Sequence, residues 1–222
     1  MPKDKLKRFA ENLTFPNFFQ PDIEEATKGF HLKGKWNREF FGNNNPIVLE
    51  LGCGKGEYTV ALAEKYPERN YIGIDRKGAR MWRGCKTSVE ENMTNVAFLR
   101  TRIDLILNFF DKNEVSEIWI TFPDPQPRRK QVKKRLTSPR FLERYKQILI
   151  PKGIIHLKTD NSEMYQFTLS TINKDGHNLL YHTSDLYNSG FSDDAVEIQT
   201  FYEQMFLKKG EKIKYIRFNL GN

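Results

Sequence analysis

Residues 47–56 read IVLELGCGKG. The first five are a mostly apolar run, of the kind that forms a buried strand. Gly52, Gly54 and Gly56 follow at alternate positions and allow the backbone to turn tightly and to approach a ligand closely. Dinucleotide-binding folds instead use G-x-G-x-x-G, in which the third glycine opens a helix that holds a pyrophosphate. The stretch therefore predicts a strand followed by a glycine turn that binds a ligand without a diphosphate.

The chain after this stretch alternates between strand-like and helix-like segments. Predicted strands are Tyr71–Asp75, Val96–Arg100, Glu117–Thr121 and Gly153–Thr159; predicted helices are Tyr58–Tyr66, Gly78–Asn92, Asp104–Phe110, Ser138–Ile148 and Ser162–Lys174. Such alternation predicts an α/β fold with a doubly wound, mostly parallel sheet of the Rossmann-like kind. The chain ends with a strand, a helix and a strand, Leu179–Thr183, Phe201–Lys208 and Ile213–Leu220. We expect the last strand to be antiparallel.

The first 45 residues differ from the rest in being polar and rich in turn residues. We expect an N-terminal extension over residues 1–45, partly flexible, with loops and one short helix. Residues 46–222 then form the α/β domain, whose ligands bind at the carboxyl ends of the strands.

Composition limits the classes of protein to which the chain can belong. Among 222 residues there are 36 basic and 28 acidic side chains, a net charge of +8 that favours a polyanionic partner. No apolar stretch approaches the ~20 residues that span a bilayer, and we expect no membrane association. Two cysteines are too few for a disulfide scaffold, which points to the cytoplasm. No pair of the four histidines has metal-ligand spacing, so we expect no metal site.

Two acidic residues accompany the glycine turn. Glu50 stands just before it, and Asp75 ends the second strand, 19 positions after Gly56. An acid at that place can accept both ribose hydroxyls of a nucleoside. Together these residues describe a nucleoside site lined with carboxylates, which suits S-adenosylmethionine because that molecule carries an ammonium, a sulfonium and no phosphate. The alternative is a generic glycine turn with one surface acid.

The fourth predicted strand is followed by residues 122–127, FPDPQP. Proline fixes its own φ and restricts the residue before it, so Asp124 is held extended between two rings. A stiff loop presenting one carboxylate at the edge of the sheet suits placing a substrate beside the methyl donor. An ordinary surface turn would also use Pro-Asp-Pro.

Directly after this loop comes a basic run, residues 128–135, RRKQVKKR. Six of its eight residues are basic and none is acidic. A solvated face is the usual reason for such a run, but its place beside the predicted site suits contacts to nucleic-acid phosphates.

Two later segments have weaker signals. Asp160 and Asn161 follow the fifth strand, where either a site residue or a helix cap fits. Thr200 and Glu203 have the spacing of a capping box, and a simple helix start is the better interpretation of that segment. His156 lies inside a strand and is expected in the core.

With these motifs, residues 9–220 resemble the bacterial tRNA (guanine-N7)-methyltransferases, which modify guanine 46 in the tRNA variable loop. FPDPxP followed by the basic run and Arg135-Leu136-Thr137 is the most specific element. The resemblance implies a class I fold, S-adenosylmethionine as cosubstrate and tRNA as partner. The family usually has tryptophan where this chain has Gln126, and an acid or amide where it has Arg102.

The resemblance also implies roles for individual residues. Asp124 corresponds to the catalytic aspartate. The cosubstrate-binding residues would be Glu50, Gly52, Gly54, Gly56, Asp75, Arg102, Asp104 and Asp124. Substrate-binding residues would be Arg128, Asp160, Thr200, Phe201, Tyr202 and Glu203, and the RNA-binding segment would be Lys130, Gln131, Val132, Lys133, Lys134 and Arg135.

Guanine N7 carries a lone pair and no proton, so it can attack the methyl group in line without a general base. Three other classes of function stay open. They are an RNA-binding protein without catalysis, a nicotinamide-dependent oxidoreductase, and a methyltransferase acting on another nucleic acid or a protein. The sequence does not determine the oligomeric state.

Overall fold

The computed structural model describes residues 3–221, whose strands form one eight-stranded sheet in the order β1-β4-β3-β2-β5-β6-β8-β7. The strands are β1 (Phe18–Phe19), β2 (Ile47–Leu51), β3 (Asn70–Asp75), β4 (Val96–Arg100), β5 (Val115–Thr121), β6 (Leu149–Thr159), β7 (Asn178–Thr183) and β8 (Lys214–Asn219). Neighbouring strands from β1 to β6 are parallel, whereas β8 runs antiparallel to β6 and β7. The predicted α/β fold, including its antiparallel last strand, is confirmed.

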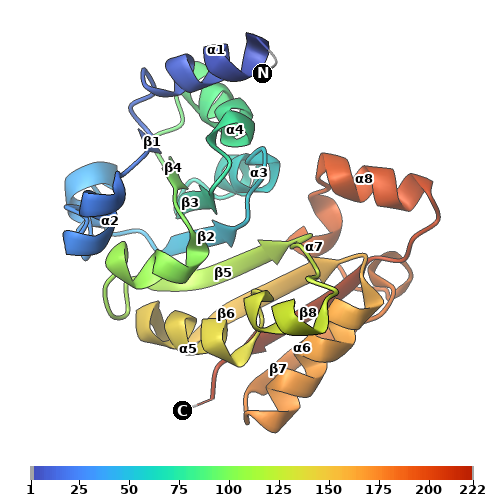
Figure 1. Cartoon of the computed structure of the whole chain (residues 1–222). Helices are drawn as coiled ribbons and strands as arrows, with labels where there is room; N and C mark the ends of the chain where they lie inside the picture. Colours follow the sequence, from blue (N-terminus) through green and yellow to red (C-terminus); the bar gives the residue numbers. More distant parts are fainter. Residues whose placement is uncertain (1–2, 222) are drawn as a thin grey trace.

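Helices cover both faces of this sheet. Figure 1 shows α1, α3 and α4 on one side, and α5 and α6 on the other. The helices are α1 (Lys3–Asn12), α2 (Ile23–Lys28), η1 (Trp36–Phe41), α3 (Glu57–Lys65), α4 (Gly78–Glu90), η2 (Ile103–Asn108), η3 (Arg129–Lys134), α5 (Pro139–Ile148), α6 (Ser162–Lys174), η4 (Leu186–Asn188), α7 (Asp194–Glu197) and α8 (Phe201–Lys208). Each face has its own hydrophobic core. Burial on both faces explains why the central strands are nearly continuous apolar runs.

Most predicted elements lie within one or two residues of their observed bounds, and β2, β4, α6 and α8 match completely. The predicted helix over residues 104–110 is a 3-10 helix, η2. Strand β6 begins at Leu149 instead of Gly153, because the buried Leu149 already pairs with Val115 of β5.

The first 45 residues contain more regular structure than loops and one short helix. Helix α1 packs on α4, β1 pairs with β4, and the π-helix η1 begins with the fully buried Trp36. Scattered aromatic residues anchor this segment, and they leave no period in the sequence for a prediction to use. The domain boundary at residue 46 stays a prediction. None of the helices in residues 3–221 has the length and apolar character to cross a membrane.

Candidate active site

The predicted site residues follow strands that are neighbours in the sheet. Strand β2 lies between β3 and β5, and β4 and β6 lie outside these. Because all five are parallel, their carboxyl ends share one edge of the sheet. The strand order reverses beside β2, the place where open α/β sheets bind ligands. The residues at these strand ends are Glu50, the glycines of residues 52–56, Asp75, Arg102, Asp104, Asp124 and Asp160.

The glycine turn lies against Asp75. Gly54 donates its backbone N–H to Asp75 Oδ2 at 3.1 Å, and the other carboxylate oxygen accepts from the N–H of Lys77. Gly52 has φ +81° and faces open space, whereas at Gly56, with φ +74°, any Cβ would collide with the ring of Phe98. Glycine is therefore required at position 56 for close packing against Phe98, whereas the side of the turn at Gly52 is open to a ligand.

Glu50 is buried and its carboxylate is occupied by internal hydrogen bonds. Oε2 accepts from the backbone N–H of Thr59, at 2.9 Å, and from its hydroxyl, and Oε1 accepts from the hydroxyl of Thr121 at 2.7 Å. Burial raises the pKa of Glu50 to about 7, although these hydrogen bonds favour the ionised form. Glu50 thus ties the first turn of α3 to the end of β5.

The raised pKa of Glu50 has a consequence for stability. An acid that is harder to ionise when folded stabilises the protein fully below its unfolded pKa, near 4.5, and loses that contribution as pH rises to about 7. We expect the free energy of unfolding of the wild type to fall by about 2–3 kcal/mol relative to Glu50→Gln between pH 4.5 and 8. Urea unfolding of both proteins across this range measures the difference. A constant difference would show that Glu50 has an ordinary pKa.

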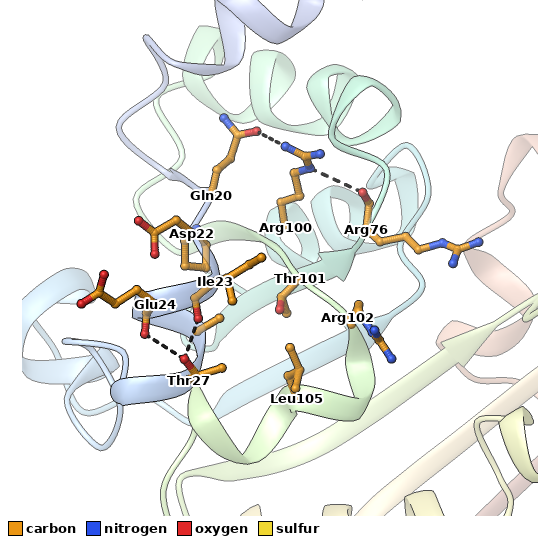
Figure 2. A pocket seen from close by; sticks show the side chains of 12 residues that line it. Gln20, Asp22, Ile23, Glu24, Thr27, Arg76, Arg100, Thr101, Arg102 and Leu105 are labelled. Carbon is orange, nitrogen blue, oxygen red and sulfur yellow. Dashed lines mark hydrogen bonds between the residues drawn. The ribbon is translucent and has the colours of Figure 1, made fainter.

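A cavity of about 650 Å³ opens at the ends of β3 and β4 (Figure 2). One side is lined by Arg76, Arg100, Thr101, Arg102 and Leu105, and the other by residues 20–24, 26 and 27 of the N-terminal segment. Arg102, one of the lining residues, forms a bidentate pair with Asp104, at 3.0 and 2.6 Å, and the guanidinium lowers the pKa of Asp104. No pattern in the sequence indicates that the N-terminal segment lines this edge of the sheet.

The Pro-Asp-Pro loop extends from the end of β5. Asp124 is exposed, and its Oδ1 accepts from the N–H of Gln126 at 3.0 Å. Phe122 and Gln126, two residues to either side of Asp124, have φ +47° and +48°. Such values are rare outside glycine and cost about 1–3 kcal/mol each, so the surrounding structure must hold the loop in place. Phe122 stacks on Phe206 of α8 with ring centroids 5.8 Å apart.

The basic run forms η3 and both its flanks. Arg128, Arg129, Lys130, Lys133 and Lys134 are exposed, and within residues 3–221 none of them pairs with a carboxylate. Gln131 and Val132 are partly buried. Arg135 differs from the other cations because its side chain is 2% exposed and its contacts are all within the protein. No feature of the sequence distinguishes Arg135 from its exposed neighbours.

Helix α8 begins beside the glycine turn. Thr200 and Glu203 form the capping box, as the sequence predicted, and both are buried. Glu203 also pairs with the buried Lys158 of β6 at 2.8 Å and accepts from Tyr187 at 2.8 Å. Burial lowers the pKa of Lys158.

The two residues inside the capping box, Phe201 and Tyr202, are the exposed ones. The N–H of Phe201 donates to Glu57 at 2.9 Å, and Lys55 of the glycine turn lies 3.9 Å from the centroid of its ring. The fold therefore brings residues 200–203 to the glycine turn, but it leaves only the aromatic pair accessible.

Asp160 and Asn161, which follow β6, have different environments in the structure. Asn161 caps α6 by accepting from the N–H of Met164 at 2.7 Å. Asp160 takes no part in that cap and is half-buried, and burial raises its pKa. The two possibilities left open by the sequence thus separate, with Asn161 as the cap and Asp160 as the candidate site residue.

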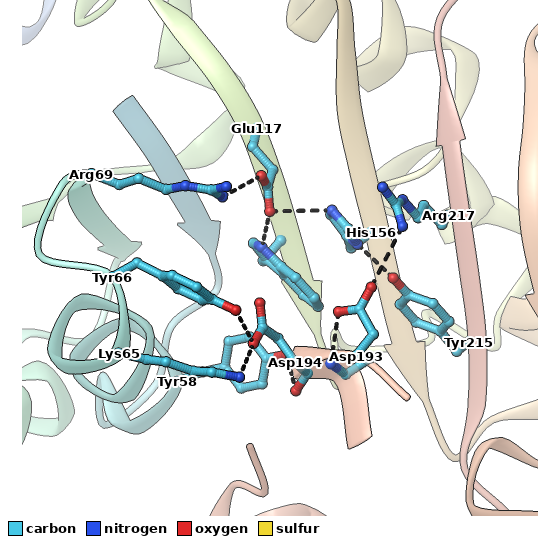
Figure 3. Close-up of polar contacts among 12 residues, drawn as sticks. Tyr58, Lys65, Tyr66, Arg69, Glu117, His156, Asp193, Asp194, Tyr215 and Arg217 are labelled. Atoms are coloured by element: carbon cyan, nitrogen blue, oxygen red, sulfur yellow. Dashed lines mark hydrogen bonds and ion pairs between the residues drawn. The ribbon is translucent and has the colours of Figure 1, made fainter. Parts of the chain in front are cut away.

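His156 belongs to a different cluster of side chains, buried on one face of the sheet (Figure 3). It stacks on Trp119 at 3.8 Å, contacts Tyr215 at 2.6 Å, and its Nε2 lies 3.2 Å from Glu117. The prediction of a core histidine is confirmed. In the part of the chain that the structure describes, no group of three or more His, Cys, Asp or Glu side chains could hold a metal ion.

A parallel sheet that reverses order beside a G-x-G-x-G turn, with an acid after the next strand, is the fold of the class I methyltransferases. Solved structures with this fold include the 16S rRNA methyltransferase KamB, at TM-score 0.64 and 12% identity over 83% of this chain and 92% of that one. Another is a 16S rRNA (adenine(1408)-N(1))-methyltransferase with cosubstrate SAM from Catenulisporales acidiphilia, at TM-score 0.56 and 13% identity over 91% and 93% of the two chains.

Sequence comparison gives the particular family. The model described as "Putative methyltransferase" matches residues 44–216. The tRNA (guanine-N(7)-)-methyltransferase of Christiangramia forsetii is 56% identical over 98% of both chains, and that of Bacteroides fragilis is 51% identical over 99% of this chain and 87% of the other. The chain belongs to the tRNA (guanine-N7)-methyltransferase family.

Proposed function

We propose that this protein transfers a methyl group from S-adenosylmethionine to N7 of guanine 46 in the variable loop of tRNA, by in-line displacement, in the cytoplasm. The observation that supports this proposal most is the shared edge of the sheet. There the glycine turn, Asp75 and the Pro-Asp-Pro loop follow neighbouring strands, and the basic run continues directly from that loop.

The residues present fit the cosubstrate. Asp75 can accept the ribose hydroxyls, and the open side of Gly52 leaves room for the backbone to approach the ligand. The cavity beyond Asp75 suits the nucleoside end, and Arg102, which lines it, is paired with Asp104. Glu50 acts indirectly in this proposal, because its carboxylate already holds α3 and β5. When bound, S-adenosylmethionine supplies a methyl group on a positively charged sulfur.

The residues of this chain contribute placement and charge. The N7–carbon bond forms as the carbon–sulfur bond breaks. The electron pair of the carbon–sulfur bond goes to sulfur, and the positive charge moves to the guanine. The exposed carboxylate of Asp124 stabilises that charge and binds the guanine edge. Asp160 follows β6, the strand next to β5, and Phe201 lies against the glycine turn, so we assign both to contacts with the guanine. The exposed cations of residues 128–134 hold the RNA backbone.

The test uses two transcripts of one tRNA, which differ only in carrying guanine or 7-deazaguanine at position 46. With labelled S-adenosylmethionine, we expect the first to gain about one methyl group, mapped to position 46, and the second to gain none because it lacks N7. Label at another nucleotide, or on protein in a cell extract and not on tRNA, would contradict the proposal and favour a methyltransferase of different specificity.

A further inference from the structure

The last cation of the basic run, Arg135, has a different environment from the rest. Its side chain is 2% exposed, whereas Lys133 and Lys134 beside it are exposed. A buried guanidinium cannot reach a phosphate on the surface. Arg135 therefore needs an explanation other than contact with RNA.

The guanidinium of Arg135 joins the Pro-Asp-Pro loop to α6. Its Nε donates to the carbonyl of Pro125 at 2.9 Å, and an Nη atom lies 3.5 Å from the carbonyl of Gln126. The same Nη pairs with Glu163 in the first turn of α6, and the group lies 4.7 Å from the ring centroid of Phe167. Residues 125–135 are thus closed into a loop by one side chain.

The loop that Arg135 holds is the one that needs support. Gln126 has φ +48°, a conformation that persists only where surrounding contacts maintain it. Its N–H is also the donor to Asp124 Oδ1. The orientation of the Asp124 carboxylate therefore depends on the peptide groups of residues 125 and 126, whose carbonyls face Arg135.

We propose that Arg135 is a positioning residue, which fixes the carboxylate of Asp124 relative to the exposed cations of η3. This inference rests on the proposed function. The proposal assigns two different roles to cations of the same basic run. Lys133 and Lys134 bind RNA, and Arg135 sets the geometry for the reaction.

The experiment compares Arg135→Gln with the double variant Lys133→Gln/Lys134→Gln, using tRNA and S-adenosylmethionine. We expect Arg135→Gln to lower kcat about 10²-fold, the effect of a small misplacement, with little change in KM for tRNA. The lysine variant should raise KM for tRNA and leave kcat near that of the wild type. The slope of log K against log salt should fall by about 1.5 for the two lysines and stay unchanged for Arg135→Gln.

Arg135→Lys is the conservative control, because an ammonium can reach one carbonyl but not form the full set of contacts. We expect an intermediate kcat, and this variant decides the matter if Arg135→Gln does not fold. A reduced salt slope with unchanged kcat for the Arg135 variants would overturn the proposal in favour of RNA contact. If the wild type methylates no tRNA, the proposed function fails. The positioning role of Arg135 is then tested by amide hydrogen exchange. Faster exchange of the amides of Phe122, Asp124 and Gln126 in Arg135→Gln would still support the positioning role, and unchanged exchange would refute it.

Discussion

Replacing Asp124 with alanine is expected to lower kcat for tRNA methylation by about 10²–10³-fold, while the affinity for S-adenosylmethionine stays within twofold of the wild type. Positive charge moves onto the guanine during the reaction, and the exposed carboxylate is aimed from a loop held by neighbouring contacts. Steady-state kinetics with tRNA and calorimetry with the methyl donor measure the two quantities separately.

Two further variants separate the charge of Asp124 from its hydrogen bonding. Asp124→Asn keeps the acceptor for the N–H of Gln126 and removes the charge, so we expect a kcat close to that of Asp124→Ala. Asp111→Ala removes an exposed aspartate from the opposite end of β5 and should leave kcat unchanged. A turnover of Asp124→Ala near that of the wild type would exclude the proposed role.

The largest expected effect on stability comes from the buried pair of Lys158 and Glu203, both fully inaccessible. Lys158→Met leaves the carboxylate of Glu203 in the interior without its counter-charge. We expect the free energy of unfolding to fall by about 3–5 kcal/mol, measured by denaturant titration. Helix α8 should loosen as well, because Glu203 also completes its capping box.

The matched control neutralises both members of the pair. In Glu203 the two carboxylate oxygens accept separately, Oε1 from the hydroxyl of Tyr187 and Oε2 from the backbone N–H of Thr200. In Lys158→Met/Glu203→Gln, the amide oxygen can accept from Thr200, and the amide NH2 can donate to the Tyr187 oxygen. We expect the double variant to regain most of the lost stability. A loss below about 1 kcal/mol in the single variant would mean that water reaches the pair.

The fold could be predicted from the sequence because its central strands contain apolar runs that end at polar or turn-forming residues. Burial on both faces and parallel pairing impose that pattern on β2 to β6. The N-terminal segment escaped prediction since two-residue β1 and the π-helix η1 exist only through contacts with the rest of the fold.

The sequence predicted which residues lie at the edge of the sheet, but not which of their side chains are exposed and which are buried. Strand order brings Asp75 and Asp124 to one edge, as expected. Whether a charged side chain is exposed there depends on partners distant in the sequence. Glu163 and Phe167 enclose Arg135, and Lys158 encloses Glu203.

Strand β1 has only two residues, yet it covers the outer side of β4. Phe18 and Phe19 pair with Phe98 and Leu99, and the N–H of Phe98 donates to the carbonyl of Asn17 at 2.8 Å. A chain shortened by its first 20 residues would leave these hydrogen-bonding groups of a central, apolar strand uncovered. Uncovered edges of this kind recruit strands from other molecules, so such a truncation would be prone to self-association and aggregation.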